Sequence, residues 1–311
     1  MDSSPVPDKT TDAGKPARSA SAMGARAIST FGLWALVVGM FLWGSPWAYV
    51  ILVGGMTMLG TWEYHGIARK AGILPMPILG MLGAGMYTAV LFFYLFHGRI
   101  AETHVLDTAA FALFLGVGFF LRLLGPVDGT RSVIGLAVAL LGFVYLAFGM
   151  NFVARVIFFG YPGSGTPPQA WLGLWLVAVT KFTDVGAYLV GSAIGKNKLI
   201  PHISPGKTRE GLLGAVLFSQ VAGCGLYAAY PHELALLGGW PTVVLLGLVL
   251  AAAAVIGDLA ESLVKRSLAI KDSGNSLPGI GGVLDLIDSL CFTAPILYFY
   301  LRLSAASGIG M

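Results

Sequence analysis

The chain has 311 residues, of which 56% are hydrophobic and 11% are charged, and its mean hydropathy is +0.80. Soluble domains contain about 45–50% apolar residues, so this composition excludes an ordinary soluble globular protein. The net charge of +4 requires no nucleic-acid partner, because the positions of the cations explain it.

The first 27 residues differ in composition from the rest of the chain. They are rich in Ser, Pro, Asp, Lys, Arg and Ala without hydrophobic periodicity, which is typical of disordered segments. Arg26 precedes an apolar run as in a signal peptide, but no small-residue cleavage site follows Trp43. We predict a disordered cytoplasmic tail over 1–27 and a first membrane segment that is retained.

Apolar stretches of about 20 residues, enough to cross a bilayer core of roughly 30 Å as helix, recur along the remaining chain. The period-2 alternation of an outer-membrane barrel is absent from the sequence. The pattern predicts an all-α, polytopic integral membrane protein with about nine transmembrane helices. We place them at about 31–44, 46–64, 74–97, 106–123, 132–149, 171–193, 210–230, 241–260 and 284–303.

The lysines and arginines are distributed unevenly between the predicted loops. With a cytoplasmic N-terminus and nine crossings, 15 of the 19 lie on the cytoplasmic side, and Arg99, Arg155 and Arg302 lie outside. Cytoplasmic loops of membrane proteins carry such an excess of cations. We therefore expect the charge-rich loops 192–209 and 261–283 to face the cytoplasm, where nucleotides are found.

Acidic residues gather where the last two predicted helices meet the 261–283 loop. Asp258 and Glu261 lie three residues apart, as do Asp285 and Asp288, so each pair shares one helical face. Paired carboxylates repel each other without a cation, and Mg²⁺ binds one or two carboxylates while keeping positions for water and phosphate oxygens. The pattern predicts a divalent metal and an ionic substrate at this membrane surface.

A further charged pair, Lys181 and Asp184, lies within the sixth predicted helix. Charged residues are costly inside a membrane and commonly mark function. The sequence leaves two interpretations open, a self-neutralising pair that fixes helix packing and a contribution to the ionic site.

The segment 195–211 is basic and rich in turn-forming residues. Its Gly-Lys-Thr sequence at 206–208 resembles the end of a Walker A motif, but Pro201 occupies the position of the first glycine and no strand is predicted before it. The segment instead places hydrogen-bond donors just before a helix, whose N-terminal amides favour anions. We predict a phosphate-binding loop, with ordinary positive-inside residues as the alternative; its donors are Ser204, Lys207, Thr208 and Arg209.

The C-terminal half contains five ordered motifs: DVGAY at 184–188, SPGKTREG at 204–211, SLVKR at 262–266, KDSG at 271–274 and LPGIGGVLDLIDS at 277–289. Together they resemble the motifs of the phosphatidate cytidylyltransferases, or CDP-diacylglycerol synthases. The similarity covers about 171–290, and before it only hydropathy and helix number agree. We therefore divide the chain into the tail, N-terminal transmembrane helices over 28–170 and a C-terminal transmembrane catalytic region over 171–311.

The resemblance implies transfer of the cytidylyl group of CTP to phosphatidate, giving CDP-diacylglycerol and pyrophosphate for phospholipid synthesis. It implies Mg²⁺, allows a second, monovalent cation such as K⁺, and is compatible with a homodimer. It also implies an inner or plasma membrane location with the active site facing the cytoplasm. The implied catalytic residues are Asp258, Asp285, Lys265 and Asp288, with Asp258 and Asp285 as metal ligands. The implied substrate-binding residues are Lys207, Thr208, Arg209, Ser204, Lys265, Arg266, Lys271, Asp272, Gly281, Gly282 and Asp184.

The sequence departs from the family pattern at four positions. Ile280 replaces a His, Leu286 an Arg, Gly206 a second Lys and Arg209 a Trp. The carboxylates and the other cations are retained, which favours a variant enzyme in which Arg209 partly replaces the lost phosphate ligands. A CTP-dependent isoprenoid-lipid kinase, a membrane transporter and an inactive scaffold are the alternatives.

Overall fold

The computed structural model describes residues 32, 34–73, 76–126, 128–270, 274 and 281–307. This part of the chain is almost entirely helical and contains one two-stranded sheet, so the prediction of an all-α protein is confirmed. The predicted tail over 1–27 lies outside the described residues, as do Lys271, Asp272 and Ile280.

The first half of the chain forms a series of helices that follow one another through short connections. A short apolar helix, Trp34–Trp43, comes first. It is followed by α2 (Pro46–Tyr49), the π-helix η1 (Val50–Gly54), α3 (Gly55–Lys70), α4 (Pro77–Phe96), the 3₁₀ turn η2 (Ile100–Glu102), α5 (Thr103–Leu123), α6 (Gly129–Gly142), the π-helix η3 (Phe143–Phe148) and α7 (Gly149–Ile157).

The second half contains the sheet and the remaining helices. Pro241 in the first turn of α10, like Pro77 in α4, occupies a position where the missing N–H has no helical partner to lose. The elements are α8 (Ala170–Ile194), β1 (Lys198–Ile200), β2 (Ser204–Thr208), α9 (Arg209–Ala229), the 3₁₀ turn η4 (Ala235–Leu237), α10 (Trp240–Ser267), α11 (Leu284–Ile287) and α12 (Leu290–Ala306).

Seven helices in the described part of the chain are long and apolar enough to cross a membrane, which makes this an integral membrane protein. They are Pro77–Phe96, Ile100–Leu123, Gly129–Ile157, Ala170–Ile194, Arg209–Ala229, Trp240–Ser267 and Leu284–Ala306. The first predicted span is the short helix Trp34–Trp43, and the second falls within α2 to α3 but is not among the seven. The count of nine therefore stays a prediction.

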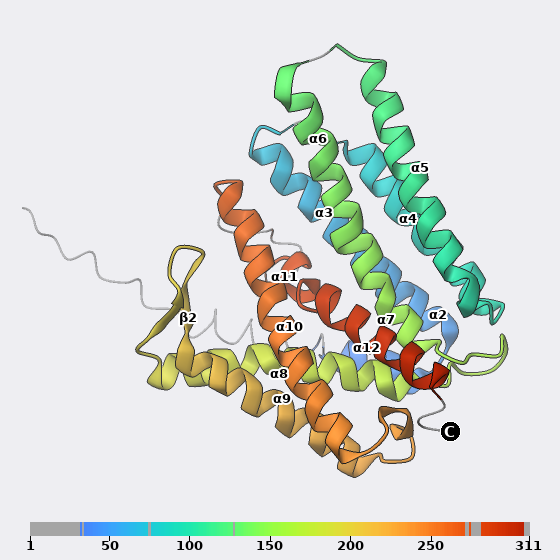
Figure 1. Ribbon diagram of the computed structural model, residues 1–311, viewed down its shortest axis with the longest axis vertical. Helices are drawn as coiled ribbons and strands as arrows, with labels where there is room; N and C mark the ends of the chain where they lie inside the picture. The colour runs from blue at the N-terminus through green and yellow to red at the C-terminus, as the bar shows by residue number, and fades with distance from the viewer. Residues whose placement is uncertain are drawn as a thin grey trace, which may run out of the picture.

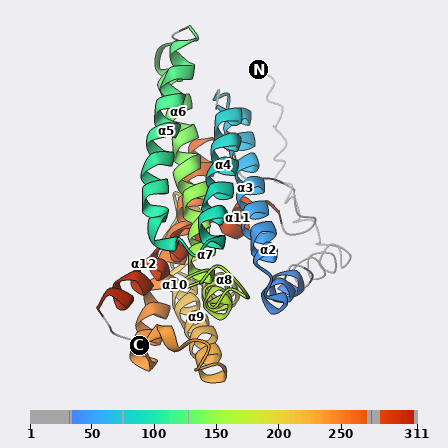
Figure 2. The same cartoon turned by 90° about the vertical axis from the view of Figure 1, so that its right-hand side faces the viewer.

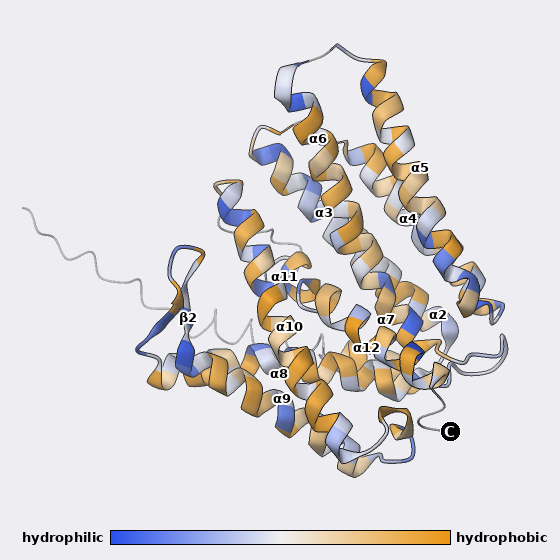
Figure 3. Cartoon of the chain, in the orientation of Figure 1, coloured by the Kyte–Doolittle hydropathy of each residue, from blue (hydrophilic) through white to orange (hydrophobic). Residues whose placement is uncertain are grey.

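The helices form two groups that cross each other. Helices α3, α4 and α5 and the continuous helix formed by α6, η3 and α7 stand side by side, and α5 and α6 extend beyond the others (Figures 1 and 2). Helices α8 and α9 run along each other across one end of this group, and β1 and β2 project from the end of the α8–α9 pair (Figure 1). The hairpin is hydrophilic, whereas the helices are mostly apolar (Figure 3).

The contact between α8 and α9 depends on two glycines. A Cβ atom on Gly186 would lie 2.3 Å from the backbone oxygen of Gly214, and one on Gly214 would lie 2.5 Å from the oxygen of Gly186. Small residues at such crossings let helix backbones approach closely in a membrane. The two helices are therefore in backbone contact, which fixes the position of the hairpin between them.

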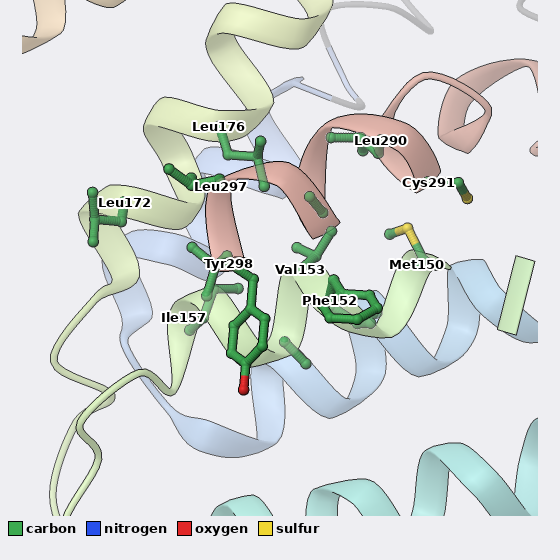
Figure 4. Packing of buried hydrophobic residues seen from close by; sticks show 14 of the residues in the cluster. Met150, Phe152, Val153, Ile157, Leu172, Leu176, Leu290, Cys291, Leu297 and Tyr298 are labelled. Carbon is green, nitrogen blue, oxygen red and sulfur yellow. The ribbon is translucent and has the colours of Figure 1, made fainter. Parts of the chain in front are cut away.

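The buried core draws on both halves of the chain. Side chains of α7, α8 and α12 interlock there, as Figure 4 shows. The buried residues labelled in that view are Met150, Phe152, Val153, Ile157, Leu172, Leu176, Leu290, Cys291, Leu297 and Tyr298.

The structure corrects the expected position of Arg155. The sequence analysis placed it in an outside loop, but α7 continues to Ile157 and the Arg155 side chain is only 2% exposed. Its guanidinium pairs with Asp107 of α5 and donates to the hydroxyl of Tyr87 at 3.1 Å. A charge partner from another helix thus allows the arginine to be buried.

Candidate active site

Three carboxylates converge between the end of α10 and the start of α12. Asp258, Glu261 and Asp288 each place an oxygen within 4.8 Å of the other two. Glu261 and Asp288 are buried, and Asp258 is half-buried. Within the described residues, Oε1 of Glu261 has no hydrogen-bond partner although it is buried. Converging carboxylates with an unpartnered oxygen fit a hard divalent cation such as Mg²⁺.

A close crossing of α10 and the α11–α12 segment brings these carboxylates together. A Cβ atom on Gly257 would lie 2.8 Å from Cα of Ser289 and 2.9 Å from the backbone oxygen of Asp288. The hydroxyl of Ser289 donates to the backbone oxygen of Ala254 at 3.1 Å. Gly257 therefore allows the approach that places Asp288 beside Asp258.

Two lysines pair with carboxylates of the cluster or beside it. Nζ of Lys265 lies 2.7 Å from Oε2 of Glu261 and 3.0 Å from Oδ1 of Asp285. Lys207, on β2, forms an ion pair with Asp258. Lys207 and Asp258 are 51 residues apart in the sequence. Strand β2 and helix α10 thus contribute to one charged site.

The pair predicted from sequence, Asp258 and Asp285, is not the group that converges. Asp285 faces Lys265 and accepts a hydrogen bond from the backbone N–H of Gly282 at 3.4 Å. Glu261, to which the sequence analysis gave no specific role, takes part instead. The assignment of Asp285 as a metal ligand stays a prediction.

Lys181 and Asp184 pair within α8, with Nζ of the lysine 3.0 Å from Oδ2 of the aspartate. The sequence analysis left open whether the pair serves packing or the ionic site. Both residues line a cavity beside the carboxylates, together with Asp285. The pair therefore borders the site, whatever it contributes to helix packing.

The predicted phosphate-binding loop forms an antiparallel hairpin rather than an irregular loop. Lys198 of β1 lies opposite Thr208 of β2. The Thr208 hydroxyl accepts from the backbone N–H of Gly211 at 3.1 Å, so this predicted substrate-binding residue caps α9. Glu210 accepts from Nδ2 of Asn197 at 2.7 Å and attaches the start of the hairpin to α9.

Two cavities near the cluster share Asp184 as a lining residue. One, of about 410 Å³, is lined by the hairpin and the ends of α8, α9 and α10, including Ser204, Lys207 and Asp258. The other, of about 300 Å³, is mostly apolar, with side chains from the Trp34–Trp43 helix and from η1, α7, α8 and α11. Asp184 lines both, and Asp285 lines the apolar one.

The remaining predicted residues lie at the margins of this site. Arg266 is exposed, and its Nε is 3.4 Å from the backbone oxygen of Ile203 in the hairpin. The backbone N–H of Arg209 donates to the oxygen of Asn197 at 2.8 Å. Gly281 has a φ of +122°, a conformation that favours glycine.

The described departures from the family pattern do not disturb the carboxylates. A side chain at Gly206 would meet nothing within 4 Å, so a lysine would fit there. Leu286 lines the apolar cavity. Lys271, Asp272 and Ile280 cannot be placed, because they lie outside the described residues.

Comparison with known proteins identifies the relatives of the chain. Over 300 residues it is 30% identical to the phosphatidate cytidylyltransferase of Synechocystis sp., covering 86% of this chain and 93% of the relative. The corresponding enzyme of Haemophilus influenzae is 30% identical over 288 residues, or 88% and 97% of the two chains. Uncharacterized protein YnbB of Escherichia coli is 35% identical over 161 residues. This alignment covers 52% of this chain and 52% of the relative, about half the length of each.

The family model of the cytidylyltransferase family matches residues 24–304, which include all the helices described above except the last two residues of α12. Both the site-forming C-terminal helices and the N-terminal helices fall within this match. The chain belongs to the cytidylyltransferase family.

Proposed function

We propose that this protein transfers the cytidylyl group of CTP to phosphatidate, giving CDP-diacylglycerol and pyrophosphate. The observation that carries the proposal is that Asp258 of the carboxylate cluster lines the cavity at the hairpin, and that this cavity shares Asp184 with a more apolar cavity. A reaction between a soluble nucleotide and a lipid needs both environments at one reacting centre. The relatives that match almost the full chain bear the name of this activity.

The more polar of the two cavities, at the hairpin, is the proposed nucleotide site. Lys207 projects from β2 beside Asp258, and Ser204 lies on the same strand. A lysine acts as a point charge toward phosphate groups. We assign to Lys207 the neutralisation of the CTP phosphates, with Ser204 as a donor.

The apolar cavity is the proposed site of the lipid near its headgroup. Its wall is largely apolar, and Lys181, Asp184 and Asp285 are its charged residues. The lipid phosphate would lie at this charged edge while its chains remain in apolar surroundings. Lys181 forms an ion pair with Asp184, and Lys265 forms one with Asp285.

The proposed reaction is an in-line displacement at phosphorus. An oxygen of the phosphatidate phosphate attacks the α-phosphorus of CTP, and the bond from that phosphorus to the bridging β-phosphate oxygen breaks. Pyrophosphate leaves with the electron pair of that bond. Positioning and charge neutralisation supply the catalysis, so the protein needs no covalent intermediate.

Asp258, with Glu261 and Asp288 beside it, is the proposed holder of Mg²⁺, and Asp285 is proposed to join it as the second predicted ligand. Bound there, Mg²⁺ would neutralise the charge that develops on the phosphates. Lys265 bridges Glu261 and Asp285 and so holds both carboxylates in position. A monovalent cation and a homodimer stay predictions.

We also propose that the site faces the cytoplasm, because the cation-rich segments lie beside it. A cysteine introduced at Asn197, which is in the exposed hairpin, tests this orientation. This cysteine should not react with an impermeant thiol reagent in intact cells, and it should react once the membrane is permeabilised. Reaction from outside would overturn the orientation.

Labelled CTP tests the reaction itself. The purified protein is given CTP labelled at either the α- or the γ-phosphorus, with phosphatidate or an isoprenoid alcohol as acceptor. The proposal predicts that only α-label enters lipid, and only with phosphatidate. Transfer of γ-label to the alcohol would identify a lipid kinase, and absence of labelled lipid in every mixture would favour a transporter or a scaffold.

A further inference from the structure

A buried carboxylate outside the catalytic motifs contacts the segment that carries Asp285 and Asp288. Glu63 lies on α3, in the N-terminal half of the chain, and is 4% exposed. Its Oε2 accepts a hydrogen bond of 2.8 Å from the backbone N–H of Leu284, 221 residues later in the sequence. This contact joins the N-terminal helices directly to the proposed catalytic centre.

The backbone N–H that donates to Glu63 belongs to Leu284, the first residue of α11. The first N–H groups of a helix have no partner within the helix and are usually satisfied by a capping side chain. The residue before α11, Val283, has no oxygen or nitrogen in its side chain, and no side-chain cap is formed there. Glu63 therefore supplies from another helix the acceptor that the local sequence lacks.

Helix α3 holds α11 at a second point on the same face. Gly60 lies one turn before Glu63, and a Cβ atom there would be 2.5 Å from Cδ1 of Ile287. Positions three apart share a helix face, so α3 contacts both Leu284 and Ile287. These two contacts constrain both the position and the rotation of the α11 turn.

The opposite side of this turn faces α10 and its charged residues. Asp285 meets Lys265 at 3.0 Å, and Asp288 joins Asp258 and Glu261. Because α11 lies between α3 and α10, a shift at Leu284 moves both aspartates relative to the α10 carboxylates. The other Glu63 oxygen faces Gly274, where a Cβ atom would lie 2.9 Å from Oε1.

We infer that Glu63 is a positioning residue for cytidylyl transfer, which sets the place of Asp285 and Asp288 by accepting the Leu284 N–H. The inference rests on the proposed function for its turnover readout. Its other readout, metal binding, concerns the proposed metal-binding carboxylates directly. Partners that orient metal ligands typically contribute roughly 10–100-fold to metal affinity or activity.

Three variants separate this role from simple packing. Glu63→Met keeps the length of the side chain and removes the acceptor. Glu63→Gln keeps a neutral acceptor in the same place. Glu63→Asp keeps the charge but is shorter by one methylene, and it serves if the methionine variant does not fold.

The first readout is Mn²⁺ binding to the purified protein, measured from the free Mn²⁺ signal by electron paramagnetic resonance. We expect Glu63→Met and Glu63→Asp to weaken binding by roughly tenfold or more. Glu63→Gln should stay within about threefold of wild type, since its carbonyl oxygen still accepts. The second readout is turnover with CTP and phosphatidate, which should fall in the same order with little change in the KM for CTP.

Two results would overturn the inference. One is Mn²⁺ binding by Glu63→Met or Glu63→Asp equal to wild type, and the other is Glu63→Gln being as impaired as Glu63→Met. Failure of the proposed function is separate, because the wild-type protein would then bind Mn²⁺ but form no labelled CDP-diacylglycerol.

Discussion

Replacing Lys265 by methionine removes the cation that lies between two carboxylates of the site. Its Nζ is 2.7 Å from Glu261 and 3.0 Å from Asp285, and the Lys265 and Glu261 side chains are 13% and 3% exposed. Breaking a buried ion pair costs about 3–5 kcal/mol, because the remaining charge has no partner. Asp285 is 36% exposed, so water can replace part of its interaction. We therefore expect a loss of about 3 kcal/mol in the free energy of unfolding, near the lower end of that range.

A divalent cation should restore much of this loss if it binds among the carboxylates. Thermal unfolding in detergent micelles, with and without MgCl₂, measures the effect. A ligand at one hundred times its Kd stabilises a protein by about 2.7 kcal/mol. The methionine variant, with one more uncompensated negative charge, should gain more from Mg²⁺ than wild type does.

Lys265→Arg is the matched control, because it keeps the charge and should unfold close to wild type. Unfolding of Lys265→Met at the wild-type temperature without Mg²⁺ would contradict this role of Lys265. So would a gain from Mg²⁺ that is no larger in the variant.

Three further changes test other parts of the structure. Thr208→Ala should lower the free energy of unfolding by about 1 kcal/mol, because it removes the α9 cap, and Thr208→Ser should restore it. Thermal unfolding measures this, and equal stability of wild type and both variants would refute the cap. Gly214→Val should force α8 and α9 apart, so that size-exclusion chromatography shows no stably folded protein. Gly225→Val is the control and should fold like wild type, because a Cβ atom there meets nothing within 4 Å. Lys207→Met should raise the KM for CTP at least about tenfold, and an unchanged KM would remove Lys207 from the nucleotide site.

Hydropathy predicted the helices well but not where they end. Helix α10 continues to Ser267, so Glu261 and Lys265 are helical residues rather than loop residues. Helix α7 likewise continues to include Arg155. In both cases a charge lies inside a helix because a partner from another element pairs with it, and a hydropathy window cannot detect that partner.

The sequence also predicted which part of the chain carries the charged site, but not which carboxylates converge. Spacing of three residues indicated that Asp258 shares a face with Glu261. The approach of Asp288 to that face depends on the absence of a side chain at Gly257, a contact between two helices. Glu63 lies outside the motifs found in the sequence, and a hydrogen bond to Leu284, 221 residues away, leaves no local signal.

The cap on α9, in contrast, has a local signal. Thr208 precedes a helix whose first turn contains Glu210, the type of residue order that marks helix starts. The hairpin that precedes the cap was expected as a loop because its strands have only three and five residues, too short for a clear alternation.

Turnover of Asp258→Asn tests the central claim, that the carboxylate cluster of Asp258, Glu261 and Asp288 is the site of cytidylyl transfer. The substitution keeps the size of the side chain and removes its charge. Asp128→Asn is the control, since Asp128 is a carboxylate at the start of α6 with 60% of its side chain exposed. With α-labelled CTP, phosphatidate and saturating Mg²⁺, Asp258→Asn should fold normally and form labelled CDP-diacylglycerol at less than about a tenth of the wild-type rate, while Asp128→Asn stays near wild type. A folded Asp258→Asn protein with more than about a tenth of wild-type turnover would contradict the claim.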